Sequence, residues 1–334
     1  MHKFKLGVGP MSREIIDLLI EYSALHAFPL MIIASRNQVD HDSGYVCLTK
    51  ELVDQVKRHP CYSEDLILLC RDHGGPYYSD LDQGRPLSDA KDRIRTTIRC
   101  DIENGFDLLH IDVSKIQHDQ LIHAKEMIDF ALSLNPKIMF EFGSEINTNE
   151  GIQESLGRLD DQLAFLADYQ PNAKFFVTQT GSLTKHTQVG SFNVENNALV
   201  AAKIHTGGFL FKEHNADYLN IPQVRDRNVA GVDAINIAPE LGAAQTRVVL
   251  RLGKLFTEEY HNFYNHVLDM GYWKRWVTAE VTDPDTFVTS GGHYCFRSKE
   301  YEKLLFAIGK DNSFIEELRN EVFGILDTYR KGLT

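Results

Sequence analysis

Short apolar segments alternate with amphipathic segments along most of the chain. Eight segments are apolar at successive positions, as expected for parallel strands that helices cover on both faces. They span residues 5–9, 29–35, 65–70, 108–113, 138–142, 174–178, 208–212 and 234–237. Apolar residues three or four positions apart predict helices over 12–25, 89–104, 117–134, 152–169, 194–204, 221–229 and 241–270. This succession of strands and helices predicts an α/β fold, a (β/α)8 TIM barrel.

An open, doubly wound sheet is the alternative architecture for the same alternation. The first predicted strand is followed by GVGPMS, which lacks the GxGxxG fingerprint of a dinucleotide site in such a sheet. We place the barrel over residues 1–270. Residues 271–334 do not repeat the strand–helix unit; they are rich in aromatic and charged residues and predict a last helix over 313–329. We expect this C-terminal extension to pack on the barrel or on a neighbouring subunit.

Composition narrows the classes of partner. The 334 residues carry a formal net charge of −12, which disfavours nucleic acid or an anionic membrane as the main partner but leaves room for an anionic substrate. No segment has the apolar length of a membrane span, and the N-terminus has no signal-peptide core. The five cysteines are odd in number and form no CxxC pair, so we expect free thiols in a reducing compartment, the cytoplasm.

Polar side chains follow the predicted strands at the end where a barrel places its active site. Asp72 and His73 follow the third strand, His186 lies in the loop after the sixth, and His214 follows the seventh. Imidazole is a common ligand of zinc and related metals, so this convergence predicts a divalent-metal site. In an extended chain Asp72 and His73 point apart, so one would bind the metal while the other serves as general acid or base.

Each of these residues also has a simpler interpretation. A single histidine at a strand end is more often a hydrogen-bonding loop residue. Asp72 could cap a helix or close a turn, and Glu145 could be a polar loop residue beside a helix cap. For His110, in the fourth strand, we favour a satisfied core histidine. Only the joint pattern points to a metal enzyme. The residues that we expect to bind substrate follow other strands or lie in the extension: Ser35, Asn37, Gln38, Asp112, Gln179, Lys185, Asn215, Asn236 and Arg297.

Six strand ends carry, in order, the motifs of a known family. RDHGGP (71–76), LHIDVS (109–114) and GSEI (143–146) stand where that family has GDHLGP, KIHLDCS and GTEV. RNQV (36–39), QTG (179–181) with HT (186–187), and FKEHNADY (211–218) match its motifs after strands two, six and seven. From about residue 9 to 251 the chain thus resembles the non-catalytic subunit family of class II tagatose-bisphosphate aldolase. It resembles more distantly the zinc-dependent class II ketose-bisphosphate aldolases.

The resemblance implies roles for several of these residues. Asp72 would be the catalytic acid/base, and His73, His186 and His214 would bind the metal. Glu145 would contact the metal or support it within the catalytic site. Zinc is the first choice of divalent ion, with manganese, cobalt or nickel as alternatives. In one respect the chain departs from the class II aldolases, which hold a substrate phosphate in a glycine-rich loop after strand seven. Here that loop contains Asp217, a poor phosphate ligand, so Arg36, Lys185 or Arg297 would have to replace it.

Two function hypotheses follow. The first is a metal-dependent enzyme that acts on a ketose, ketose phosphate or keto-uronate, by aldol-type cleavage or by epimerisation at C4 through an enediolate. The second is a non-catalytic accessory subunit that stabilises a separate aldolase partner. The joint presence of the site residues favours the enzyme, because a scaffold has no physical need for histidines on one rim. A sugar-phosphate kinase lacks support, since the sequence has no GxxxxGK[ST] P-loop. We expect a homo-oligomer.

Overall fold

The computed structural model describes residues 1–147, 152–180, 189–309 and 313–334, and of residues 144–147 the backbone only. Eight parallel strands close into a barrel in the order β1, β10, β9, β8, β7, β6, β5, β2, which confirms the predicted TIM barrel and excludes the open sheet. All eight predicted strands are present. They are β1 (Leu6–Val8), β2 (Leu30–Ser35), β5 (Ile67–Asp72), β6 (Leu108–Asp112), β7 (Met139–Asn147), β8 (Ala173–Gln179), β9 (Leu210–Glu213) and β10 (Ala234–Ile237).

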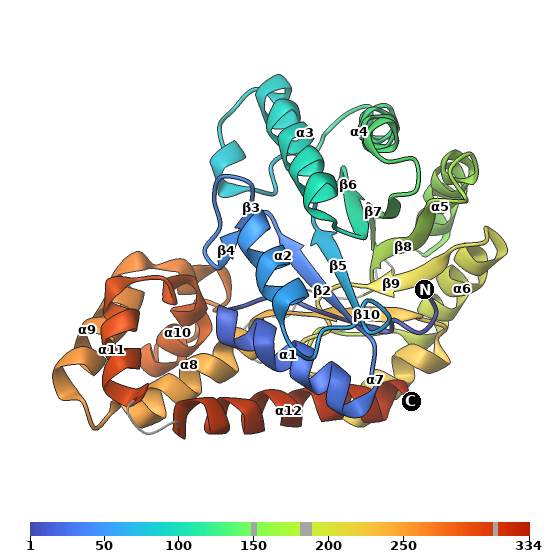
Figure 1. Ribbon diagram of the computed structural model, residues 1–334. Helices are drawn as coiled ribbons and strands as arrows, with labels where there is room; N and C mark the ends of the chain where they lie inside the picture. Colours follow the sequence, from blue (N-terminus) through green and yellow to red (C-terminus); the bar gives the residue numbers. More distant parts are fainter. Residues whose placement is uncertain (148–151, 181–188, 310–312) are drawn as a thin grey trace.

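Helices surround the barrel, as Figure 1 shows. They begin and end at residues that suit the role: Ser12 caps the first helix by accepting from the backbone N–H of Ile15, and Gly105, with φ 86°, ends the third. Seven of the helices are α1 (Arg13–His26), α3 (Leu87–Asn104), α4 (Gln120–Leu134), α5 (Ile152–Ala167), α6 (Val194–Thr206), α7 (Ile221–Val229) and α8 (Pro239–Gly253).

Between β2 and β5 the chain forms structure that the sequence pattern did not predict. The short strands β3 (Val39–Asp40) and β4 (Cys47–Leu48) pair with each other, and α2 (Thr49–Arg58) follows them. Only a few apolar residues of α2 are buried, Leu52, Val53 and Val56 among them, so its periodic signal is short. The predicted helix over 241–270 is two helices, α8 and α9 (Thr257–Met270), because the first ends at Gly253, a weak helix former.

The C-terminal residues form a group of helices beside the barrel (Figure 1). This group contains η2 (Tyr272–Arg275), α10 (Pro284–Gly291), η3 (Gly292–Cys295), α11 (Lys299–Ile308) and α12 (Ser313–Leu333). Helices α10 and α11 contact α8 and α9, and α12 runs back along α1, α7 and α8. The division at residue 270 and the neighbouring subunit stay predictions. No helix in the described part of the chain combines the length and apolar character that crossing a bilayer requires.

Candidate metal centre

The strand β5 ends in the first two residues of the site. Asp72 is its last residue, and His73 follows with φ 46°, in the left-handed region. The prediction that the two side chains point apart is therefore wrong: the left-handed backbone ends the alternation of an extended strand and turns the imidazole toward Asp72. Nε2 of His73 lies 3.9 Å from Oδ2 of Asp72. Gly74 and Gly75 follow so closely over β6 that a Cβ at either would collide with the backbone carbonyl oxygens of His110 and Asp112.

The neighbouring strand β6 supplies His110 and Asp112, two residues apart and on one face of the strand. Asp112 accepts a hydrogen bond from Nδ1 of His73 at 2.7 Å, which directs the other ring nitrogen of His73 toward the site. His110 is buried, and its Nδ1 accepts a hydrogen bond from the backbone N–H of His73 at 3.1 Å. Its Nε2 has no hydrogen-bond partner among the described residues, and its ring lies 5.0 Å from the ring of His214. The favoured interpretation of His110 as a satisfied core histidine is thus wrong. Gly143 makes room for it, since a Cβ there would collide with the ring.

Strands β7 and β9 close the site from the other side. Glu141, in β7, is fully buried, and its Oε2 accepts a hydrogen bond from the Lys212 ammonium at 2.7 Å. Its other oxygen, Oε1, lies 3.6 Å from Nε2 of His214, which follows β9. Lys212 itself is fully buried among the strands and lies over the ring of Phe175. The lysine therefore neutralises Glu141 and fixes the direction of its free oxygen.

Asp72, His73, His110 and His214 form the cluster that we call the metal cluster; their ligand-type atoms all lie within 4.8 Å of one another. Oδ1 of Asp72 lies 3.5 Å from Nδ1 of His214 and 3.7 Å from Nδ1 of His110. Ligands bound tetrahedrally to zinc are about 3.4 Å apart, from Zn–N and Zn–O lengths of about 2.1 Å. The spacing therefore fits a divalent ion.

Unsatisfied buried atoms support the same fit. Oδ1 of Asp72, Oε1 of Glu141, and Nε2 of His110 and of His214 are buried and have no hydrogen-bond partner within the part of the chain that the structure describes. Leaving such atoms unpaired in a protein interior is unfavourable, so buried polar atoms of this kind call for a ligand such as an ion or a water molecule. Imidazole nitrogens with carboxylate oxygens are the donor set that zinc and its neighbours bind.

The charges of the cluster act on one another. Burial alone would raise the pKa of Asp72, but His73 and His214 hold it well below its usual value. Burial would lower the pKa of His73, but Asp72 and Asp112 raise it to about 9. Burial likewise opposes ionisation of Glu141, whose pKa is nevertheless lowered to about 2, mainly by Lys212. The carboxylates are thus ionised at neutral pH and available to a cation.

A cavity of about 360 Å³ opens over the metal cluster. Asp112, Gln179 and Asn215, three of the predicted substrate residues, line it together with three of the cluster's histidines. The other described residues of its wall are ones that the sequence analysis did not select: Tyr78, Ser114, Lys115, Gly143, Val177 and Thr178. The ring of Tyr78 stacks on that of His73 at 4.7 Å, so the wall and the cluster are in direct contact.

The remaining predicted substrate residues lie elsewhere. Asn37 exchanges hydrogen bonds with Asp80, Gln38 is buried and donates to the sulfur of Met11, and Arg297 donates to the carbonyl oxygen of Gly44. Two further residues are placed without lining the cavity: Ser35, at the end of β2 beside Asp72, and Asn236, buried in β10.

Arg36, considered above for a phosphate, is fully buried. It bonds the carboxylates of Asp40 and Asp82 at 3.2 and 2.5 Å and is not available to a ligand. His186 and Lys185 lie outside the described residues, and for Glu145 the structure describes only the backbone, within β7. Their predicted roles stay predictions.

The residues that the sequence analysis missed share one signal. His110 precedes Asp112 by two positions, Glu141 precedes Gly143 by two, and Lys212 precedes His214 by two. Residues two apart in a strand share a face of the sheet. If a residue at the end of a strand points into the site, the residue two positions before it therefore points into the barrel interior below the site. The alternation rule, applied to each predicted strand end, would have selected all three.

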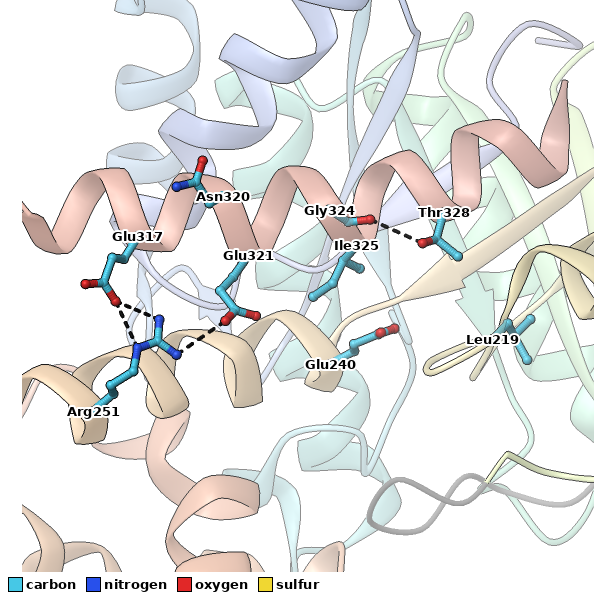
Figure 2. Close-up of a pocket in the computed structure, with 9 residues that line it drawn as sticks. All are labelled: Leu219, Glu240, Arg251, Glu317, Asn320, Glu321, Gly324, Ile325 and Thr328. Carbon is cyan, nitrogen blue, oxygen red and sulfur yellow. Dashed lines mark hydrogen bonds and ion pairs between the residues drawn. The ribbon is translucent and has the colours of Figure 1, made fainter.

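A second cavity, of about 570 Å³, lies outside the barrel between α8 and α12 (Figure 2). Its charged groups are already paired: Arg251 bonds Glu317 at 2.7 Å and Glu321 at 3.5 Å. No cluster of metal-ligand type among the described residues lies there. The metal cluster lies instead beneath the smaller cavity.

Comparison with models of known protein families finds no match. Among solved structures, the chain is similar to a probable tagatose 6 phosphate kinase from Sinorhizobium meliloti 1021, with a TM-score of 0.78 and 15% identity over 98% of this chain and 99% of that one. It is also similar to fructose-bisphosphate aldolase (Fba) from Campylobacter jejuni (TM-score 0.59, 13% identity, 99% and 90% covered) and to the YdjI aldolase from Escherichia coli K12 (0.52, 14%, 93% and 93%). At such identities the likeness shows a shared fold, in agreement with the resemblance drawn from the motifs.

Proposed function

We propose that this protein is a divalent-metal-dependent sugar enzyme that acts on a ketose, ketose phosphate or keto-uronate. The proposed reaction is aldol-type cleavage of a carbon–carbon bond, or epimerisation at C4 by cleavage and re-addition. The observation that carries the proposal is the metal cluster, half-buried at Asp72 and His73 and buried at His110 and His214, at the carboxyl end of the barrel. Two structural neighbours named as aldolases support this chemistry.

All five cysteines are unpaired, which supports a cytoplasmic setting.

The ligands that we propose for the ion are His73, His110 and His214. A divalent ion held there, zinc as first choice, would polarise a substrate carbonyl and stabilise the negative charge of an enediolate. Asp112 orients the ring of His73 through the hydrogen bond at Nδ1, as the carboxylate partners of metal-binding histidines do. Glu141 adds negative charge beside His214 and is itself held by Lys212.

Asp72 is the proposed acid/base. Its carboxylate is ionised at neutral pH and can accept the proton of the C4 hydroxyl. When the C3–C4 bond breaks, its electron pair passes to the enediolate fragment, and C4 with its oxygen becomes an aldehyde. Re-addition of the enediolate to the other face of that aldehyde re-forms the bond, and Asp72 returns the proton to the C4 oxygen. The same residues thus serve cleavage and epimerisation.

The first test is elemental analysis of the purified protein beside the double variant His73→Ala/His214→Ala. We expect about one divalent ion per chain in the wild type and its loss in the variant. The matched control is His205→Ala/His261→Ala, which removes two exposed histidines outside the site and should keep the ion. Asp72→Asn should weaken ion binding without abolishing it, because its Oδ1 belongs to the cluster while the proposed ligands are histidines, and it should lose turnover by about 10²- to 10⁴-fold.

Screening ketose phosphates and keto-uronates for cleavage and for C4 epimerisation then separates the two reactions. A wild type that binds no ion after incubation with zinc or manganese would overturn the proposal. The accessory-subunit hypothesis would then remain, and its test is whether a separate aldolase gains stability or activity from this chain.

A further inference from the structure

The cavity over the metal cluster has one permanently cationic side chain in its described wall. Lys115 is the only lysine or arginine among its described lining residues; the others are histidines, the Asp112 carboxylate and uncharged groups. Lys115 follows β6 directly after Ser114, at the carboxyl end of the barrel. An anionic group that enters beside the cluster would therefore meet a side-chain ammonium at this position.

Lys115 is connected to the metal cluster through one aromatic ring. Its Nζ lies 4.0 Å from the ring centroid of Tyr78, and that ring stacks on His73 at 4.7 Å with an interplanar angle of 11°. The Tyr78 hydroxyl hydrogen-bonds with Ser114, which in turn donates to Asp112 at 2.7 Å. The ammonium is thus separated from His73 by at most the sum of the two ring distances, a length that a six-carbon chain can span.

Within the described residues, the Lys115 ammonium donates one hydrogen bond, to the carbonyl oxygen of Tyr77 at 3.0 Å, and no carboxylate lies at ion-pair distance. An ammonium has three donors, so two remain for a ligand. Lys115 is an exposed residue at the rim of the cavity, and partial burial lowers the pKa of its ammonium. An ammonium with free donors at this position attracts an anion, and salt screens that attraction.

The usual anion site of such a barrel is already filled here. TIM barrels often bind phosphate at the loops after the last two strands and a helix N-terminus. In this chain the carboxylate of Asp217, in the loop after β9, accepts the backbone N–H groups of Ala238 and Glu240 at the start of α8, at 3.0 and 2.9 Å. Because the chain's own carboxylate satisfies these donors, they are not free for a substrate anion.

Resting on the proposed function, we propose that Lys115 is the specificity-determining residue that binds the terminal anionic group of the substrate, a carboxylate or a phosphate. The sugar chain would run from the metal cluster past Tyr78 to this ammonium. A single lysine without a helix N-terminus beside it matches the single charge of a carboxylate better than the double charge of a phosphate. We therefore expect the sugar acid to be the tighter of the two.

The test compares three probes that share a ketose chain: fructose, fructose 6-phosphate and fructuronate. Their dissociation constants are measured by calorimetry on the metal-loaded wild type and on Lys115→Met, which keeps the length of the side chain but removes its charge. Lys115→Arg keeps the charge. Lys174→Met is the matched control, because Lys174 also donates to one backbone carbonyl oxygen, that of Pro171, outside the described wall of this cavity. Metal content is measured in every sample.

In the wild type we expect the anionic probes to bind at least tenfold more tightly than fructose. Lys115→Met should weaken the preferred anionic probe by about ten- to hundredfold, the strength of a hydrogen bond to a charged group, and leave fructose unchanged. Lys115→Arg should restore most of the affinity. If fructuronate binds more tightly, the substrate is a sugar acid. If fructose 6-phosphate binds more tightly, the substrate is a sugar phosphate.

Two outcomes would overturn the role of Lys115: anionic probes that bind the wild type no better than fructose, or a Lys115→Met variant that weakens all three probes equally. The proposed function fails separately, by the absence of metal in the wild type. A metal-free protein that still prefers anionic probes through Lys115 would keep this inference and remove the metal enzyme.

Discussion

His73 owes its orientation to Asp112, which accepts the hydrogen bond from Nδ1 at 2.7 Å and is itself buried. Asp112→Asn keeps the shape of the side chain but weakens the hydrogen-bond acceptor for Nδ1 of His73, because the amide carries no charge. We expect a 10- to 100-fold loss in metal affinity, the usual effect of removing such a partner. Competition with a fluorescent chelator measures it. Asp107→Asn, just before β6, is the control, since the Asp107 carboxylate accepts from the backbone N–H of Leu69, away from His73. Equal affinities in both variants would contradict the prediction.

His293 should make stability depend on pH. It is buried beside Tyr45, Tyr294 and Trp276, and neither ring nitrogen has a hydrogen-bond partner in the described segments. Burial, together with the charge of Arg275, lowers its pKa to about 3. The unfolded chain, with a histidine pKa of about 6.5, binds a proton that the folded chain does not. The free energy of unfolding should therefore fall as pH drops from about 6.5 toward 3.

The slope of this loss is about 1.4 kcal/mol per pH unit for one group. His293→Leu removes the titrating ring and should flatten the profile by that amount, with little change above pH 7. Urea denaturation of both proteins at pH 5 and pH 8 measures the difference. Parallel profiles would show that His293 is protonated in the folded protein.

Single residues also mark the limit of sequence reasoning. Asp72 and His73 were identified as a site from their position at a strand end, but their relative orientation depends on the left-handed backbone of His73, which no periodicity reveals. His110 looked like a core residue because it is apolar-flanked within a strand. It belongs to the site because Asp112 shares its face. The alternation was present in the sequence, whereas the backbone angle was not.

At the scale of elements, α12 supports the loop that follows His214. The Tyr329 hydroxyl lies 2.7 Å from the carbonyl oxygen of Ala216 and 2.8 Å from Glu240, and it accepts from the backbone N–H of Leu219. Tyr329→Phe removes the hydroxyl from the carbonyl oxygen of Ala216 and the N–H of Leu219, whereas Glu240 keeps the N–H of Tyr218. We therefore expect a loss of about 1–3 kcal/mol in the free energy of unfolding.

Chemical denaturation checks this loss against Tyr169→Phe, whose hydroxyl makes exposed contacts with Lys125 and Asp129 and should matter by less than about 1 kcal/mol. A Tyr329→Phe variant as stable as Tyr169→Phe would show that α12 is held by apolar packing alone.

The long helices and strands were predictable because each is periodic over many residues. The short β3, β4 and α2 were not, because their form depends on contacts with the rest of the barrel.

At the scale of the whole molecule, the barrel was predictable because many elements repeat one unit, so an error in one does not change the architecture. The site depends on which loops and side chains come together in space. The sequence predicts only that a given residue lies at the end of a strand. The side chains that meet in the site concentrate negative charge. Asp72, Asp112 and Glu141 are all ionised at the mouth of the barrel, in a chain whose net charge is −12. A divalent cation would offset that charge and stabilise the fold.

Removing the metal should therefore lower the thermal stability of the wild type. A ligand present at 100 times its dissociation constant stabilises the folded state by about 2.7 kcal/mol, which for a chain of this size is a shift of about 5 °C in Tm. We expect EDTA to produce such a shift and zinc to reverse it, while His73→Ala/His214→Ala responds to neither. Differential scanning fluorimetry measures the Tm of the wild type and of the double variant, each with EDTA and each with zinc. If the double variant responds to zinc as the wild type does, the stabilising ion lies outside the metal cluster, for example at the group formed by Asp40, His41 and Asp42.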